Sequence, residues 1–217
     1  MWIAARRQTA GRGRRGRSWL AAQSALAASL LTTTDRSPSQ AAQLSFVTAL
    51  AVADTASRWA SVDLVRLKWP NDVMLGGAKL SGILIESGQT GTGGLWLAIG
   101  VGINLAGAPE GIDYPATDLA SGLSAGREPP GQDEVMAVLA EQMAVRLAQW
   151  SQTGFAPVRE AWLERAYALG QPCIARVGEN ALSGVAEGLD VDGALLLRLD
   201  SGEVRRITAG DVFFGGS

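Results

Sequence analysis

The sequence predicts an α+β fold in which helices pack on a mixed or antiparallel β-sheet, followed by a small β-barrel. Strand-like runs rich in Val, Ile and Leu fill much of the first half of the chain. Three longer stretches have helical spacing of apolar residues, and the last part consists of short strands separated by glycine-containing turns. We therefore expect a larger unit at residues 1–170 and a small β-unit at residues 171–217.

The chain begins with two strands and a helix. Trp2 to Ala5 is apolar and predicts a strand, and Ser24 to Thr34 alternates as a second strand beyond a loop rich in Arg and Gly. Ser37 and Pro38 then open a helix, because serine caps helix N-termini and proline suits the first helical position. Apolar residues recur on one face of this helix to about Trp59.

Strands and helices complete the larger unit. Three strand-like runs follow, at Leu64–Lys68, Lys79–Glu86 and Gly94–Leu105. Gly76-Gly77 predicts one hairpin turn and Gly88–Gly94 a second. After a loop from Gly107 to Gly131, helical spacing returns at about Asp133–Trp150 and Pro157–Leu169.

Short strands make up the C-terminal part. They are predicted at Pro172–Val177, Ala181–Gly188, Ala194–Leu199 and Glu203–Ile207. Turn residues such as Gly, Asn and Asp separate them. Strands this short and this closely spaced are typical of a small β-barrel.

Composition excludes several classes of protein. The chain is 47% hydrophobic and 18% charged, which is typical of a folded protein. It has no histidine and one cysteine, Cys173, so an intrachain disulfide, a multi-cysteine metal site and a histidine-assisted nucleophile are excluded. No apolar run reaches the roughly 18 residues of a membrane span. Because Arg6 and Arg7 lead into glycines, we expect no signal peptide and a cytoplasmic protein.

Positive charge is concentrated near the start of the chain. Net charge is −2, yet six of the nineteen basic residues fall within the first 17 positions. We call the segment from Gln8 to Trp19 the Arg/Gly loop, because three glycines alternate there with four arginines. Glycine lets backbone approach a ligand closely, and guanidinium groups match carboxylates and phosphates. The loop is therefore predicted to close around an anion.

A second group of polar residues lies further along the chain. Lys68 and Lys79 are the only lysines beside 17 arginines, which suggests sites that need a compact ammonium group. Pro70 ends a strand and Asn71-Asp72 is a turn signal. Lys79 then lies close to Gly82, where a ligand can approach the backbone. Taken alone, Lys79 is more typical of a surface strand residue, and the stem of Lys68 can simply pack against Trp69.

These segments together resemble the catalytic module of the biotin–protein ligases, the biotin–[acetyl-CoA-carboxylase] ligase family. The resemblance rests on four ordered motifs, the Arg/Gly loop, Lys68-Trp69-Pro70-Asn71-Asp72, Lys79-Leu80-Ser81-Gly82-Ile83-Leu84 and Gly100-Val101-Gly102-Ile103-Asn104. It covers essentially the whole chain. It implies the class II synthetase-like fold of biotin–lipoate transferases, with an SH3-like C-terminal β-domain.

The resemblance implies an ATP-dependent ligase. Such an enzyme activates biotin as biotinyl-5′-AMP, with ATP and Mg²⁺, and passes biotin to a lysine of a carboxyl-carrier domain in a biotin-dependent carboxylase. The implied partner is that carrier domain. Neither DNA nor a membrane is expected as a partner, and the implied assembly is a monomer or a homodimer.

The resemblance also implies roles for individual residues. Biotin and its adenylate would be bound by Gln8, Gly11, Arg12, Gly13, Arg14, Trp19, Lys79 and Gly82. Catalytic roles are implied for Lys79, Arg14 and Asp72, with Lys79 on the carboxylate and α-phosphate oxygens. Asp72 would steer Mg²⁺ or the incoming amine and is the single candidate metal contact. Asn104 would lie in the nucleotide pocket.

One departure from the family keeps other interpretations open. In the family a strand, a helix and a Ser-Thr-Asn segment that lines the biotin pocket precede the Gln-Thr-Ala-Gly motif, whereas here Met1 lies seven residues before Gln8. A weakly active or non-catalytic remnant is therefore the main alternative. A lipoate or octanoate transferase fits less well, because those enzymes lack this arginine–glycine run. The remaining alternative is a nucleic-acid-binding module acting through the Arg/Gly loop.

Overall fold

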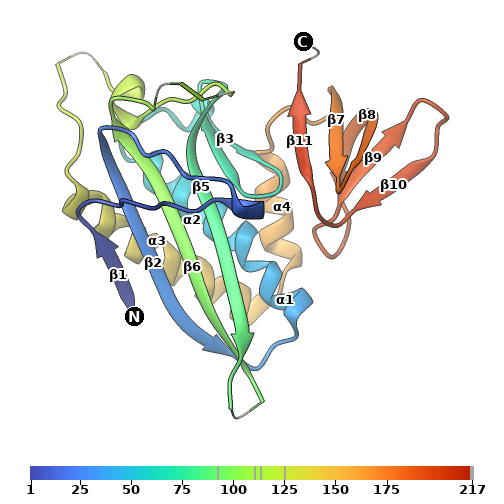
Figure 1. Cartoon of the computed structure of the whole chain (residues 1–217), viewed down its shortest axis with the longest axis horizontal. Coiled ribbons are helices and arrows are strands. Elements are labelled where there is room, and N and C mark those ends of the chain that lie inside the picture. The colour runs from blue at the N-terminus through green and yellow to red at the C-terminus, as the bar shows by residue number, and fades with distance from the viewer. Residues whose placement is uncertain (92, 110, 113, 125, 216–217) are drawn as a thin grey trace.

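The computed structural model describes residues 1–91, 93–109, 111–112, 114–124 and 126–215. Over these residues the chain forms two antiparallel sheets and four α-helices, which confirms the α+β class (Figure 1). One sheet has six strands and the other has five. None of the described helices combines the length and the apolarity needed to cross a lipid bilayer.

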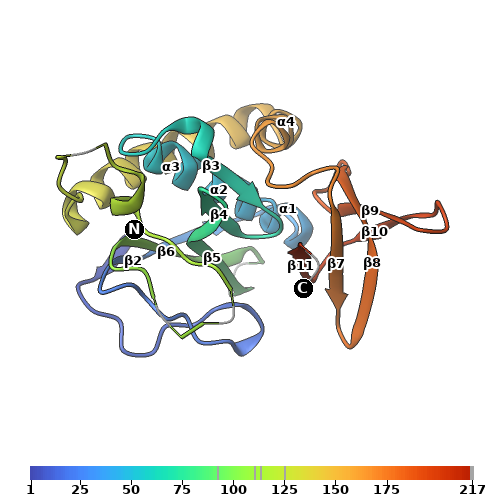
Figure 2. The same cartoon turned by 90° about the horizontal axis from the view of Figure 1, so that it is seen from above.

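The large sheet has the strand order β1-β2-β6-β5-β4-β3, with every neighbouring pair antiparallel. Its strands are β1 Trp2–Ala5, β2 Ser24–Thr34, β3 Val65–Lys68, β4 Asp72–Leu75, β5 Ala78–Gln89 and β6 Leu95–Ala106. Buried and accessible residues alternate along β2 and β6, as expected for strands that cover a core with one face. The helices lie on that face, and the Arg/Gly loop crosses the opposite face (Figure 2).

The helices differ in three respects from the sequence prediction, and one of them is that the last helix ends at Glu164 and not at about Leu169. The helices are α1 Pro38–Ala42, α2 Leu44–Ala56, α3 Gln132–Thr153 and α4 Ala156–Glu164. The single helix expected from Ser37 to about Trp59 is therefore wrong, because the chain breaks at Gln43, whose N–H turns back to the carbonyl of Gln40. The expectation of one apolar face was also too narrow, since eleven of the thirteen α2 residues are buried.

The start of α1 gives a test of local stability. Ser37 Oγ accepts the Gln40 N–H, and the Gln40 side chain accepts the Ser37 N–H, which forms a capping box. Ser37→Ala is expected to lower the free energy of unfolding by about 1 kcal/mol, measured by urea denaturation. Ser37→Gly should cost only about a few tenths of a kcal/mol, because glycine is acceptable at this position. Equal losses for both variants would contradict the capping role.

The second sheet has the order β10-β9-β8-β7-β11, which is compatible with a small barrel-like domain. Its strands are β7 Pro172–Val177, β8 Asn180–Leu189, β9 Leu195–Leu199, β10 Val204–Ile207 and β11 Asp211–Phe214. Four of them were predicted, and β11 was missed. This last strand pairs with β7 and faces the large sheet (Figure 1).

The turns around β4 and β5 also refine the prediction. Gly76 and Gly77 both have positive φ values, 59° and 85°, and form the expected hairpin turn. The turn joins β5 to β4, a strand that the sequence prediction missed. The second turn was placed too early, because β5 continues through Gly88 to Gln89 before the chain reverses.

Candidate active site

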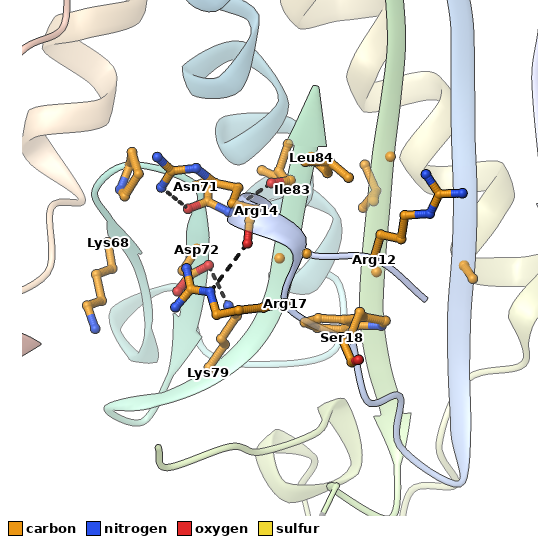
Figure 3. Close-up of a pocket in the computed structure, with 18 of the residues that line it drawn as sticks. Arg12, Arg14, Arg17, Ser18, Lys68, Asn71, Asp72, Lys79, Ile83 and Leu84 are labelled. Atoms are coloured by element: carbon orange, nitrogen blue, oxygen red, sulfur yellow. Dashed lines mark hydrogen bonds and ion pairs between the residues drawn. The ribbon is translucent and has the colours of Figure 1, made fainter. Parts of the chain in front are cut away.

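A cavity of about 400 Å³ lies over the helix-free face of the large sheet (Figure 3). The Arg/Gly loop, strands β2, β5 and β6, the turn from Lys68 to Asp72 and strand β11 all contribute to its wall. This volume falls within the range of sites that bind small molecules. The cavity therefore brings together the segments that the sequence singled out.

Small residues form the floor of the cavity. Gly82 on β5 pairs directly with Gly102 on β6, and the indole of Trp19 lies on this pair of glycines. A Cβ atom on Gly102 would lie 2.6 Å from Trp19 Cε2, and one on Gly82 would lie 3.0 Å from Trp19 Cζ3. Side chains at these positions would displace the indole, so the close approach depends on glycine.

The Arg/Gly loop is closed by its own backbone. The Gly13 N–H donates to the Arg17 carbonyl at 2.7 Å, and the Trp19 N–H donates to the Gly11 carbonyl at 2.9 Å. Arg15 and Gly16 turn the chain at the tip with positive φ values of 57° and 75°. The loop is therefore a short hairpin across the cavity.

Arg14 is the loop residue with the most polar partners. Its guanidinium donates to Asn71 Oδ1 at 3.2 Å and to the Gly210 carbonyl at 3.1 Å. Burial lowers the pKa of Arg14, while the nearby Asp211 and Asp72 carboxylates oppose that shift. Arg14 thus connects the loop, the turn before β4 and the second sheet.

Lys79 is held in place by its side chain and by its backbone. Lys79 Nζ lies 2.7 Å from Asp72 Oδ1, and the two side chains are 17% and 18% exposed. The ammonium also faces the rings of Trp19 and Tyr114, at 5.6 and 5.2 Å. The Lys79 N–H donates to the Pro115 carbonyl at 2.9 Å, so its position in the wall is fixed.

Lys68 is a second ammonium group in the wall. Burial lowers its pKa, and its Nζ lies 5.9 Å from the ring of Phe213 on β11. The Trp69 indole N–H donates to the Gly193 carbonyl at 3.1 Å and so anchors the same turn to the second sheet. The sequence alone left open whether Lys68 belongs to the site, and the structure places it in the cavity wall.

The structure places most of the predicted site residues together. Gln8, Arg12, Gly13, Arg14, Trp19, Asp72, Lys79 and Gly82 line the cavity. Figure 3 shows Arg12 extending over β6, away from the pair formed by Lys79 and Asp72.

Gly11 and Asn104 do not belong to the cavity wall. Gly11 supports the loop through its carbonyl. The Asn104 side chain accepts the Ala22 N–H at 3.2 Å and donates to the Thr117 carbonyl at 3.0 Å. Asn104 is 1% exposed. Its side chain therefore connects two buried backbone segments beside the site and does not form part of the cavity wall.

Several residues of the wall were missed by the sequence reasoning. Tyr114, Pro115, Asp211 and Phe213 all line the cavity. Tyr114 and Pro115 lie in a segment that was predicted only as a loop. Asp211 and Phe213 lie on β11, which was not predicted. Only their placement in space identifies them.

The comparisons with known proteins agree with this geometry. The family model described as the biotin/lipoate A/B protein ligase family matches residues 2–104, and the biotin protein ligase C-terminal domain matches residues 168–215. The chain is 43% identical to a biotin–[acetyl-CoA-carboxylase] ligase from Paracoccus denitrificans, and the match covers 99% of this chain and 90% of that protein. The chain belongs to the biotin–protein ligase family. A ligase of the same name from Mycobacterium tuberculosis is 33% identical, over 97% of this chain and 77% of its own length.

A solved structure extends the family relationship to the whole fold. The biotin protein ligase from Aquifex aeolicus, in complex with biotin and ATP, superposes with a TM-score of 0.82 at 27% identity. The match covers 100% of this chain and 89% of that chain. The biotin–protein ligase fold thus includes both the large sheet and the second sheet.

Proposed function

We propose that this chain is an ATP-dependent biotin–protein ligase that makes biotinyl-5′-AMP and transfers biotin to a lysine of a carboxyl-carrier domain. The observation that carries the proposal is the fixed pair of cations, Lys79 and Arg14, at one cavity of small-molecule size. The reaction brings a carboxylate and a triphosphate together, and both are anions. Family membership and the ligand-bound relative support the same function.

In the first half-reaction an oxygen of the biotin carboxylate attacks the α-phosphorus of ATP. A new P–O bond forms, the bond to the bridging oxygen breaks, and pyrophosphate leaves with the bonding electrons. Lys79 and Arg14 stabilise the negative charge on the α-phosphate and on the attacking oxygen. Because both groups are already held by neighbours, little reorganisation is needed when the charge develops.

Magnesium would reach the site with ATP. Among the described residues no group of three or more metal-ligating side chains is present, so this part of the chain offers no complete cage for the ion. Asp72 supplies one carboxylate beside Lys79, which fits an ion that is bound mainly by phosphate oxygens and water. There the ion would supply positive charge to the phosphates.

In the second half-reaction the ε-amine of the carrier lysine attacks the acyl carbon of biotinyl-5′-AMP. The C–N bond forms, the C–O bond to the phosphate breaks, AMP leaves and the amine loses a proton. We infer that Asp72 steers this amine, because its carboxylate lies in the wall beside Lys79. Residues 1–170 would contain the groups that act on the substrates, and residues 171–217 would complete the cavity wall through β11. The enzyme would act in the cytoplasm.

The test uses the full chain with biotin, ATP, Mg²⁺ and an unbiotinylated carrier domain. Pyrophosphate release and biotin on the carrier, detected by mass spectrometry, are expected. Lipoate or octanoate in place of biotin should give neither product. Biotin binding without pyrophosphate release would overturn the proposal in favour of a non-catalytic remnant, and transfer of lipoate would overturn it in favour of the related transferases.

A further inference from the structure

The turn that carries Asp72 connects β3 to β4 at the edge of the cavity. We call residues 68–72 the Asp72 turn. Lys68 and Asp72 are direct partners in the pairing of β3 with β4, so only three residues separate them. Both side chains line the cavity, and Asp72 Oδ1 lies 2.7 Å from the Lys79 ammonium. The position of this turn therefore decides where the Asp72 carboxylate and the Lys79 ammonium lie.

One anchor of the Asp72 turn comes from the second sheet. Trp69 is 4% exposed, and its indole N–H donates to the Gly193 carbonyl at 3.1 Å. The two residues are 124 positions apart, so the contact depends on how the second sheet packs against the larger unit. A buried indole N–H needs an acceptor, and Gly193 supplies it. The contact therefore fixes the Trp69 ring and the turn that carries it.

Gly193 is itself held in place. It lies in the turn between β8 and β9, where its N–H donates to the Asp190 carbonyl at 3.2 Å. The Asp190 carboxylate accepts the Asp192 N–H in the same turn at 2.8 Å. Gly193 has a φ of 90°, and a Cβ atom there would lie 2.7 Å from Phe46 Cε2. Glycine therefore lets this turn pack on α2 and bring a fixed carbonyl to Trp69.

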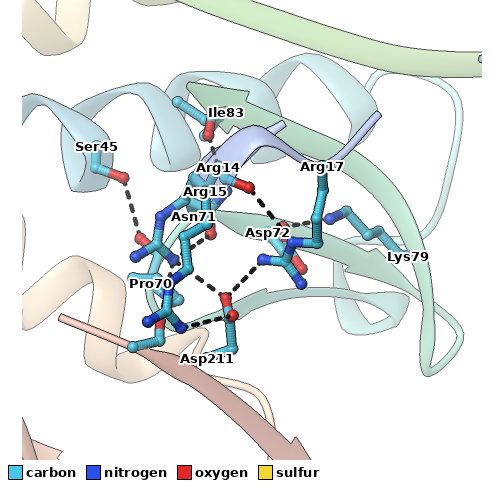
Figure 4. A network of polar contacts seen from close by, with 11 residues as sticks. Arg14, Arg15, Arg17, Ser45, Pro70, Asn71, Asp72, Lys79, Ile83 and Asp211 are labelled. Carbon is cyan, nitrogen blue, oxygen red and sulfur yellow. Dashed lines mark hydrogen bonds and ion pairs between the residues drawn. The ribbon is translucent and has the colours of Figure 1, made fainter. Parts of the chain in front are cut away.

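A second anchor of the Asp72 turn comes from α2 (Figure 4). Ser45 Oγ donates to the Pro70 carbonyl at 3.0 Å. On the sheet side, the Ile83 N–H donates to the Asn71 carbonyl at 3.0 Å, and the Asn71 side chain donates to the Ile83 carbonyl at 2.8 Å. The turn is thus held from three directions, by the second sheet, by α2 and by β5.

Two of these anchors start outside the cavity wall, at Gly193 and at Ser45. Trp69 itself borders the cavity, but its one polar side-chain atom, Nε1, is bonded to the second sheet and is not free for a substrate. A shift of about 1 Å in a reacting group, caused by a change far from the chemistry, can lower a rate by about 10²-fold. The anchors can therefore control the reaction without contact with substrate.

We propose that Trp69 and Ser45 are positioning residues that fix the Asp72 turn, with Gly193 of the second sheet as the acceptor for Trp69. This inference rests on the proposed ligase function. Both residues act through Asp72 and the ammonium that it holds. Because the charge that Lys79 stabilises grows as the reaction proceeds, their effect belongs in the rate of the bound complex and not in KM for biotin.

The test compares Trp69→Phe with the wild-type full chain. The variant keeps a buried aromatic ring and removes the N–H that Gly193 accepts. Single-turnover pyrophosphate release at saturating biotin and ATP should fall about tenfold, while KM for biotin stays within about twofold. In an Asp72→Asn background the same change should have almost no further effect, because the turn acts through that carboxylate. A tenfold loss in both backgrounds would overturn the inference.

Trp150→Phe is the matched control. Trp150 on α3 is 6% exposed, and its indole N–H donates to Gln43 Oε1 at 3.1 Å, outside the cavity wall. The same chemical change there should lower stability to urea by a similar amount and leave pyrophosphate release within about twofold of wild type. Equal rates for Trp69→Phe and Trp150→Phe would overturn the inference, as would a raised KM for biotin with an unchanged saturated rate.

Ser45→Ala removes the second anchor and serves as an independent variant if Trp69→Phe folds poorly. Its saturated rate should fall about threefold with KM unchanged, and a wild-type rate would contradict the inference. Hydrogen exchange without substrate gives a further measurement. Amides of residues 65–75 should exchange about tenfold faster in Trp69→Phe and at the wild-type rate in Trp150→Phe. If wild type makes no biotinyl-5′-AMP while this difference holds, the proposed function fails and the anchoring of the turn stands.

Discussion

Replacing Lys79 with alanine is expected to lower the rate of biotinyl-5′-AMP formation by about 10²–10³-fold, the usual cost of removing one fixed donor from a developing negative charge. The structure gives the physical reason. Lys79 Nζ is held by Asp72 at 2.7 Å and its backbone is held by Pro115, so the ammonium is fixed before the reaction begins. Single-turnover pyrophosphate release at saturating biotin and ATP measures this step directly.

Arg66→Ala provides the matched control for this prediction. Arg66 is also a cation on the large sheet, but its guanidinium donates to the Val62 and Val65 carbonyls and lies outside the cavity wall. Its removal should leave the single-turnover rate within about twofold. A Lys79→Ala enzyme that keeps the wild-type rate would rule out the proposed electrostatic role of Lys79.

Local sequence signals sufficed for most of the fold. Alternation identified β2 and a run rich in Val, Ile and Leu identified β6. The Ser37-Pro38 pair identified the start of α1, and Gly76-Gly77 identified a hairpin turn. Each of these signals depends on a few neighbouring residues, so it can be recognised without knowledge of the rest of the chain. The four-residue strands β4 and β11 were missed, and β4 begins at Asp72, which was interpreted as part of a turn.

The candidate site could be predicted only in part. Lys79, Asp72 and Arg14 lie in motifs with a recognisable order, and the structure brings all three to one cavity. Asp211 lies far along the chain in a short strand, and only the pairing of β11 with β7 carries it to the loop. The side chain of Asn104 bonds to two backbone segments, and its role in the nucleotide pocket stays a prediction.

A methyl group added at Gly102 is expected to weaken substrate binding by about 5- to 150-fold. The new Cβ atom would lie 2.6 Å from Trp19 Cε2, so the indole must leave the glycine floor. Overpacking of this kind costs about 1–3 kcal/mol. Trp19 is the last residue of the Arg/Gly loop, and its N–H donates to the Gly11 carbonyl. Displacing the indole therefore destabilises the closed form of the loop. KM values for biotin and ATP, together with tryptic cleavage of the loop, measure the effect of Gly102→Ala.

Two comparisons separate this clash from a general loss of stability. Gly100→Ala lies two residues earlier on the same strand, and its Cβ atom would meet Leu84 and Ser29 only at ordinary distances of 3.5 Å or more. It should therefore leave loop cleavage unchanged. In a Trp19→Ala background, Gly102→Ala should have almost no further effect, because the atom it collides with is gone. A Gly102→Ala penalty of equal size in both backgrounds would show that the floor does not act through Trp19.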